Sequence, residues 1–237
     1  MINLRSTLIV TFFILVTLTV VIVAQDVKNK AEPYSDLLDI ELVDEAKFKD
    51  MNYYALEDGQ KNLSLDSDNL IVVNQADFIF QKTNGEIFNK DGEITNFSTE
   101  SGNYKAKTKE LTLVDDVKLE NKEAEYSANY LKLNQSKNLL NANGEVNAKF
   151  KDLKTDDKIT IASEKMKSEL DKKIIYFTGN IQGELKRKRR YEGGFSFQSQ
   201  NMSLNQLESQ ILLSNDVKLQ RNDYDVEAQK AEIFLEN

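Results

Sequence analysis

Four copies of one residue pattern follow one another along this chain, and this repeat constrains the fold more than any other feature. The copies are Tyr104, Leu111, Leu113, Asp115, Val117 and Leu119; Leu133, Leu140, Ala142, Gly144, Val146 and Ala148; Ser168, Ile175, Phe177, Gly179, Ile181 and Gly183; and Leu204, Ile211, Leu213, Asn215, Val217 and Leu219. Offsets within the copies are identical, and their Val or Ile anchors lie 29, 35 and 36 residues apart. A weaker copy precedes them at Phe88, Gly92 and Ile94.

Within each copy the apolar residues occupy every second position, which is the spacing of a β-strand with one buried side. A single copy is too small to bury its own apolar side, so stacked copies must bury a shared interior. The repeat therefore predicts an all-β fold, an elongated open β-jellyroll of stacked antiparallel strands. Its two end strands keep unpaired edges, and such an edge is a hazard or a docking site.

Turn signals divide the predicted strands. Asn84-Gly85 and Asn143-Gly144 are typical of two-residue hairpin turns, in which both central residues need positive φ. Asp91-Gly92 and Gly179-Asn180 indicate breaks of the same kind. The composition of residues 164–172 would suit a helix, but the third copy of the repeat runs through them, so we expect strand there.

The N-terminus carries an apolar segment of membrane length. Residues 6–24 contain no charged residue, Gly or Pro, and as a helix they would span about 28 Å. Arg5 precedes this segment, which favours a cytoplasmic N-terminus and an exported remainder. The alternative is a cleaved signal peptide, but Ile22-Val23-Ala24 is a poor cleavage site. We therefore expect an uncleaved transmembrane anchor (1–25), a linker with Pro33 (26–40) and a β-domain (41–237).

Composition excludes several function classes. The chain has no Cys and no His, which removes thiol chemistry, the Ser-His and Cys-His nucleophile systems and most transition-metal sites. It has 31 Lys and Arg against 39 Asp and Glu, and a net charge of −8 does not favour nucleic acid. We expect no cofactor, no metal and no enzymatic activity.

Three charged motifs have alternative interpretations. Asp66-Ser67-Asp68 begins like a calcium loop, but Ile71 stands where that loop requires Gly and no Glu stands at its twelfth position, so a calcium site is rejected. Asp115-Asp116 and Asp156-Asp157 fit turn residues at strand ends, although paired carboxylates also serve in glycoside hydrolases. The basic run from Lys186 to Arg190 indicates a solvated hairpin loop or a contact with anionic headgroups, such as lipid A phosphates or a membrane surface.

Several segments carry a family resemblance: residues 53–59 (YYALEDG), residues 63–73, and SGNY at 101–104 followed by LTLVDDV at 111–117. Together with the N-terminal anchor, they resemble the lipopolysaccharide-export bridge family, and within it the membrane-anchored C components (LptC). The chain is longer than typical members, and its fourth repeat makes the C-terminal end LptA-like. That repeat either replaces or extends the end at which a downstream partner would dock.

The resemblance implies a periplasmic β-jellyroll that is anchored in the cell inner membrane by one span. It implies a carrier that receives lipopolysaccharide from the Lpt ABC transporter complex at the N-terminal edge and passes it to an LptA-type bridge protein at the C-terminal edge. The lipid A acyl chains would lie in an apolar groove. Gly59 matches the family's glycine at the transporter interface.

The candidate groove residues are the inward side of the alternating pattern: Phe78, Phe80, Ile94, Tyr104, Leu113, Val117, Leu119, Leu133, Val146, Phe177 and Ile181. The same residue types build an ordinary packed core, and only the resemblance favours a lipid groove. The alternative is a structural or adhesion-type periplasmic repeat protein with a dry interior. Lipid that copurifies with the protein would separate the two.

Overall fold

The computed structural model describes residues 45–73, 76–89, 92–151, 156–188, 193–221 and 223–235. The expected anchor (1–25), the linker (26–40) and residues 41–44 lie outside this part of the chain. Among the residues that are described, no helix is both long enough and apolar enough to cross a membrane.

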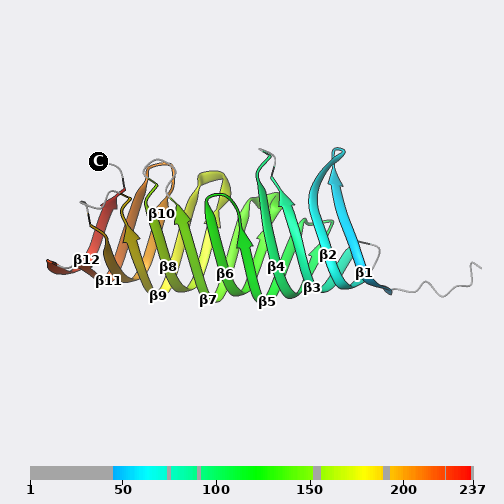
Figure 1. Cartoon of the computed structure of the whole chain (residues 1–237), viewed down its shortest axis with the longest axis horizontal. Helices are drawn as coiled ribbons and strands as arrows, with labels where there is room; N and C mark the ends of the chain where they lie inside the picture. Colours follow the sequence, from blue (N-terminus) through cyan, green and yellow to red (C-terminus); the bar gives the residue numbers. More distant parts are fainter. Residues whose placement is uncertain are drawn as a thin grey trace, which may run out of the picture. The chain divides into compact units, whose positions relative to one another are not determined.

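The described residues form a sheet of twelve antiparallel strands in which each strand pairs with its neighbours in sequence (Figure 1). The strands are β1 (Glu45–Glu57), β2 (Gln60–Val73), β3 (Asp77–Phe88), β4 (Ile94–Lys105), β5 (Glu110–Glu120), β6 (Ala124–Asn134), β7 (Leu139–Lys151), β8 (Lys158–Glu169), β9 (Ile174–Lys186), β10 (Phe195–Asn205), β11 (Gln210–Arg221) and β12 (Tyr224–Phe234). Two short 3-10 turns, η1 (Gln135–Lys137) and η2 (Leu170–Lys172), connect strands. The predicted all-β stack with two end strands is confirmed, and residues 164–169 are strand.

The turn-forming residue of each repeat lies at a bend inside a strand. In β5, β7, β9 and β11 two consecutive residues have positive φ, and the strand pairing shifts register there. These pairs are Asp115-Asp116, Gly144-Glu145, Gly179-Asn180 and Asn215-Asp216. Two left-handed residues in succession turn the strand through a corner without ending it.

Both predicted hairpins are therefore wrong. Asn143-Gly144 stands at the corner of β7, and Asn84-Gly85 lies within β3, paired with Asp66 and Leu65 of β2. A hairpin turn of the predicted type and the corner at Gly144-Glu145 both need two adjacent positive-φ residues, so local sequence does not separate them. Asn84 and Gly85 have no positive φ, and Gly85 instead leaves room for the ring of Phe97. Gly92 does lie between β3 and β4, as predicted, and its N–H donates to the carbonyl of Asn89 (3.0 Å).

The bends divide the sheet into two facing layers. Figure 1 shows the row of bends along one long side of the stack. Layer 1 ends in a row of turns, row 1, that includes Asp58-Gly59 and residues 121–123. Layer 2 ends in row 2, which includes the turns 106–109, 135–138, 170–173 and 206–209. Backbone hydrogen bonds chain the row 2 turns together, from Gln135 N–H to the Lys109 carbonyl and from Gln206 N–H to the Lys173 carbonyl (3.1 and 3.0 Å).

Apolar side chains fill the space between the layers. They form one cluster that extends from Leu63 in β2 to Leu235 after β12. Aromatic pairs join the layers: the Tyr53 and Phe78 ring centroids are 4.3 Å apart, and those of Phe150 and Phe177 are 6.2 Å apart. These pairs join β1 to β3 and β7 to β9. The strands of the two facing layers run obliquely to each other, so each strand faces a later strand across the interior.

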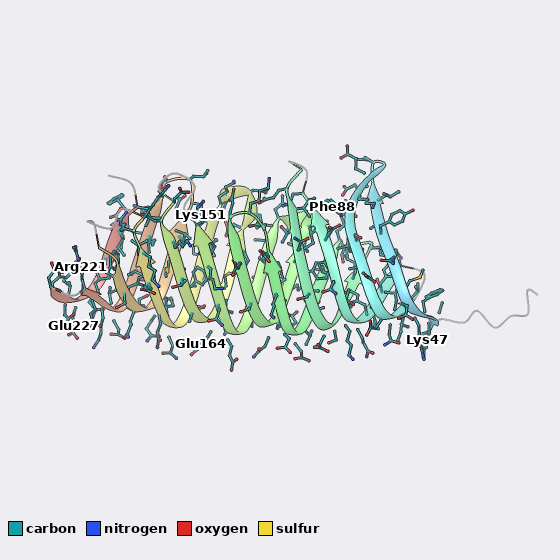
Figure 2. The ribbon with its side chains drawn as sticks, viewed as in Figure 1. Lys47, Phe88, Lys151, Glu164, Arg221 and Glu227 are labelled. Carbon is teal, nitrogen blue, oxygen red and sulfur yellow. The ribbon has the colours of Figure 1, made fainter. Side chains whose placement is uncertain are left out.

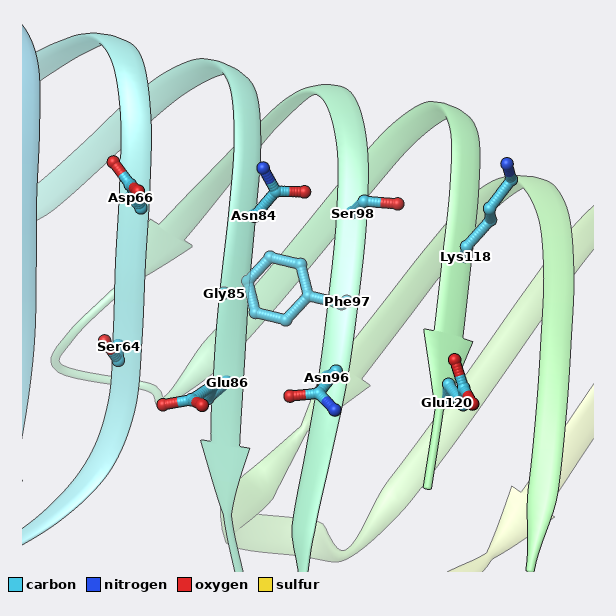
Figure 3. A pocket seen from close by; sticks show the side chains of 10 residues that line it. All are labelled: Ser64, Asp66, Asn84, Gly85, Glu86, Asn96, Phe97, Ser98, Lys118 and Glu120. Carbon is cyan, nitrogen blue, oxygen red and sulfur yellow. The ribbon is translucent and has the colours of Figure 1, made fainter. Parts of the chain in front are cut away.

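Glycines on the interior side stand directly opposite phenylalanines of the neighbouring strand. A Cβ at Gly183 would fall 2.1 Å from Cζ of Phe197, so the ring occupies the space that a side chain would take. The arrangement recurs in β3 and β4 (Figure 3). The three pairs are Gly85 with Phe97, Gly102 with Phe80, and Gly183 with Phe197. The rings thus lie along the sheet, which is how a large side chain shields a bare backbone.

Candidate functional site: the apolar interior

The structure brings ten of the eleven predicted groove residues together in the interior. Their exposed fractions range from 0 to 8%. They are Phe78, Phe80, Tyr104, Leu113, Val117, Leu119, Leu133, Val146, Phe177 and Ile181. The inward direction of the repeat is confirmed for these positions, whereas their contact with lipid stays a prediction.

Ile94 was placed on the wrong side of the strand, since it is 45% exposed. In the part of β4 that lies in layer 1, the buried side chains are Phe97 and Thr99. Since side chains alternate between the two faces of a strand, Ile94 points outward. The register of β4 shifts between Ser98 and Ser101, which reverses the alternation and turns Tyr104 inward. In the full copies the residue two positions before the anchor stands at a bend inside a strand, whereas Gly92 lies between β3 and β4, so the weaker copy does not give the inward side at Ile94.

Sequence reasoning left out a large share of the interior. The completely buried residues it did not select include Leu63, Leu65 and Leu70 in β2 and Leu185 in β9. A signal was present, because Leu63 and Leu65 alternate with polar residues as the selected positions do. The interior therefore already begins in β2, two strands before the first full copy of the repeat.

Among the described residues, the interior surface continues uncovered at one half of the first strand and one half of the last strand. In β1, Phe48 pairs with the buried Leu70 and yet is 40% exposed. In β12, Val226 pairs with Leu219 and is 42% exposed. Both exposures arise because the strands of the two layers cross obliquely, so that a strand faces a later strand across the interior. Among the described strands, one half of β1 and one half of β12 therefore have no strand opposite them.

The outer face of the stack is polar. Lys47, Glu164 and Glu227 project away from the ribbon, as Figure 2 shows. Depressions of about 500 Å³ and 380 Å³ lie over the Gly85–Phe97 and Gly183–Phe197 pairs. The larger is lined mainly by polar side chains, among them Asp66, Glu86, Glu120 and Lys118 (Figure 3). Within the described part of the chain, no three acidic side chains lie close enough together to hold a metal ion.

A polar contact joins the two rows of turns near the N-terminal end. Glu57 in row 1 accepts a hydrogen bond from the ammonium of Lys109 in row 2. Beside it, Tyr104 is hydrogen bonded to the side chain of Asn62, and burial raises the pKa of the Tyr104 phenol. The layers are therefore in contact along this edge, with their apolar side chains beneath.

A second contact joins the rows at the C-terminal end, and it corrects the interpretation of the basic run. Nη1 of Arg187 lies 2.8 Å from Oδ2 of Asp157, whose side chain is 4% exposed. The same guanidinium donates to the carbonyls of Leu235 (2.8 Å) and Phe234 (3.2 Å). Arg187 therefore does not sit in a solvated loop, and Asp157 is a buried ion-pair partner. Its partner lies 30 residues away, so no local motif indicated the pair.

The neighbours of Arg187 in the basic run are also paired. Lys186 lies 3.1 Å from Glu184, and Lys188 contacts Asp156. Hydrogen bonds and charge from Lys188 and Lys151 lower the pKa of Asp156 to about 2. The described part of the run thus carries its own carboxylate partners. Arg189 and Arg190 lie outside the described residues, so headgroup contact there stays a prediction.

Two comparisons with known proteins found a match. A family model described as "LptC: Lipopolysaccharide-assembly, LptC-related" matches residues 9–218. A similar solved structure is that of LptH from Pseudomonas aeruginosa, described as the LptA homologous periplasmic component of the conserved lipopolysaccharide transport device. It shares 9% identity at a TM-score of 0.47, over 54% of this chain and 94% of that chain. No curated protein sequence matches the chain.

Proposed function

The chain belongs to the LptC-related family of lipopolysaccharide assembly, and from this premise we propose that it carries lipopolysaccharide with the acyl chains between its two layers. It would receive the lipid from the Lpt ABC transporter complex and pass it to an LptA-type bridge protein. The single observation that carries this proposal is the apolar interior, which is continuous from β2 to Leu235 and which the described residues leave uncovered at Phe48 of β1 and Val226 of β12.

Acyl chains suit such an interior because they need no specific polar partner. Each buried CH₂ contributes roughly 0.8 kcal/mol, so affinity grows with chain length alone. An apolar wall of uniform character also lets a lipid move along it without leaving a strong site.

The strand pairing would let the layers separate without breaking the walls. Every pairing among the described strands joins neighbours in sequence, so these layers meet through side chains. Separating the layers removes apolar contacts such as Tyr53–Phe78, and inserted acyl chains replace contacts of the same kind. The backbone ladders, which are costly to break when buried, stay intact.

The two end strands supply the proposed docking edges, β1 toward the transporter and β12 toward the bridge protein. The β1–β2 turn at Asp58-Gly59 has positive φ at both residues, and nothing lies within 4 Å of where a Gly59 side chain would begin. We expect Gly59→Val to weaken copurification with the transporter. Gly59→Asn is the matched control, because Asn tolerates this φ better than a β-branched residue. Unchanged copurification of Gly59→Val would remove Gly59 from the interface.

The proposed address is the inner membrane, with a single span at the N-terminus and the β-stack in the periplasm. This rests on the uncharged residues 6–24. Intact-mass measurement of membrane-extracted protein should find the full N-terminal segment attached. A mature N-terminus at Gln25 would contradict the anchor.

Direct binding tests the function against the dry-interior alternative. Delipidated, folded protein should bind lipopolysaccharide saturably, and free lipid A should compete because the acyl chains supply the affinity. The core sugars alone should not compete. A folded protein that binds neither lipopolysaccharide nor lipid A would favour the structural repeat, whose interior side chains contact only one another.

A further inference from the structure

The end of β12 is fastened across the interior by one side chain. Arg187 follows β9 in row 1, whereas Leu235 follows β12 and lies in row 2, where its N–H donates to the Ser209 carbonyl (2.8 Å). The guanidinium binds the carbonyls of Phe234 and Leu235 and the carboxylate of Asp157 at once. Asp157 is held in turn, because its Oδ1 accepts the backbone N–H of Lys188 (2.9 Å).

The apolar side chain of Leu235 lies beneath this contact and packs into the end of the interior. Its side chain is 1% exposed, and it belongs to the interior cluster together with Leu185 of β9. Among the described strands β12 pairs only with β11, so the sheet holds its end from one side. The family match ends at residue 218, and β12 and Leu235 therefore lie beyond it. Asp157 and Arg187 lie within the matched region, whereas the two carbonyls that the guanidinium binds lie beyond it.

We infer that Asp157, Arg187 and the main chain at Phe234 and Leu235 form a latch that closes the layer 2 side of the C-terminal end against acyl chains, whereas the layer 1 side, with Val226, stays uncovered by the described residues. The inference rests on the proposed function and adds its regulation. In the closed state Leu235 covers the apolar surface near Leu185. When the guanidinium releases the two carbonyls, the end of β12 moves away and this surface joins the lipid path.

Arg187→Lys tests the latch. The ammonium keeps a charge beside Asp157 but lacks the planar fork that reaches the carboxylate and both carbonyls together. With a photoreactive residue at Leu185, crosslinking to lipopolysaccharide should rise about tenfold, as expected for losing roughly one charge-assisted hydrogen bond. Crosslinking from Val117, in the middle of the stack, should not change.

Two further variants keep the test independent of folding defects. Leu235→Ala removes the apolar side chain but keeps the hydrogen bonds from Arg187 to the main-chain carbonyls, and it should also increase crosslinking at Leu185. Lys186→Gln is the matched control, since it removes a neighbouring exposed charge outside the latch, and it should leave crosslinking unchanged. Thermal unfolding midpoints of all variants establish that the stack is folded.

The outcomes separate the latch from the function beneath it. Lipid crosslinking at Val117 with equal labelling of Leu185 in wild type and Arg187→Lys would overturn the latch and leave the carrier function standing. Reduced labelling at Leu185, or an equal rise at both positions, would also overturn a local latch. No crosslinking at either position in any folded variant would contradict the carrier function itself, and the latch with it.

Discussion

The packing of Phe197 against Gly183 predicts a measurable loss of stability on adding a single methyl group. In Gly183→Ala the new Cβ would lie 2.1 Å from Cζ of Phe197 and 2.3 Å from its Cε2. Ordinary contact begins at 3.4 Å, so the ring must move by roughly 1.3 Å. Phe197 is 1% exposed and surrounded by the interior cluster, which leaves little room for that movement.

Overpacking of a buried site costs about 1–3 kcal/mol. Replacing Gly by Ala also stabilises the folded state by about 0.4–1 kcal/mol, because it lowers the conformational entropy of the unfolded chain. We therefore expect the free energy of unfolding to fall by about 1–2 kcal/mol in total. For a domain of this size the midpoint should fall by roughly 2–4 °C per kcal/mol. Urea and thermal unfolding followed by circular dichroism measure the change, and Ser196→Ala, an exposed neighbour on β10, should stay within about 0.5 kcal/mol of wild type.

A double-mutant cycle with Phe197→Leu separates this contact from a general effect. The leucine alone should cost about 1–2 kcal/mol because it leaves a void. In the double variant it makes room for the alanine methyl, so the two costs should fall short of additivity by about 1 kcal/mol. Additive costs, or a neutral Gly183→Ala, would refute the close packing of ring on glycine.

Three further predictions follow from burial and charge. Leu113→Ala, at a completely buried position, should cost about 2–5 kcal/mol in urea unfolding, and a loss below about 1 kcal/mol would contradict a packed interior. Burial raises the pKa of Tyr126 above its ordinary 10.0, so the folded state keeps a proton that the unfolded state releases. The contribution of Tyr126 to stability should be constant below pH 10.0, its ordinary pKa, and should fall above it. Tyr126→Phe should flatten this alkaline slope, and an unchanged slope would refute it. Asp156, with its pKa lowered to about 2, should titrate nearer its ordinary value of 3.8 in Lys188→Gln, as NMR can measure. The contribution of the Asp156 carboxylate to stability is present above pH 3.8 and is lost as the pH falls toward about 2.

The repeat predicted the interior well because alternation is a local property. Val117, Val146 and Ile181 share one offset from a bend, and all three are 1% exposed. The same local property misled at Ile94, where the register shift of β4 changes the alternation. The bend at Gly144-Glu145 was predicted as a hairpin for a physical reason, since a bend and a hairpin each need two adjacent residues with positive φ.

Contacts that depend on the crossing of the layers could not be predicted from local patterns. Arg187 meets Asp157 over 30 residues and Leu235 over 48. The sequence near Arg187 contains only a basic run, which is typical of a solvated loop. The pairing arises because a turn of row 1 faces a strand end three strands further along the stack, and this offset is a property of the assembled sheet.

Lipid contact inside the stack tests the carrier function most directly. Photoreactive residues would be placed at three inward and three neighbouring outward positions in the membrane-bound complex with the transporter. These are Val117, Val146 and Phe177, which are buried, and Lys118, Glu145 and Asn180, which are exposed. We expect the inward positions to crosslink to lipopolysaccharide, more strongly during ATP hydrolysis, and the outward ones not to crosslink. Equal labelling of both sets would mean nonspecific contact, and no inward labelling in folded, assembled protein would contradict the proposal that this interior carries lipid.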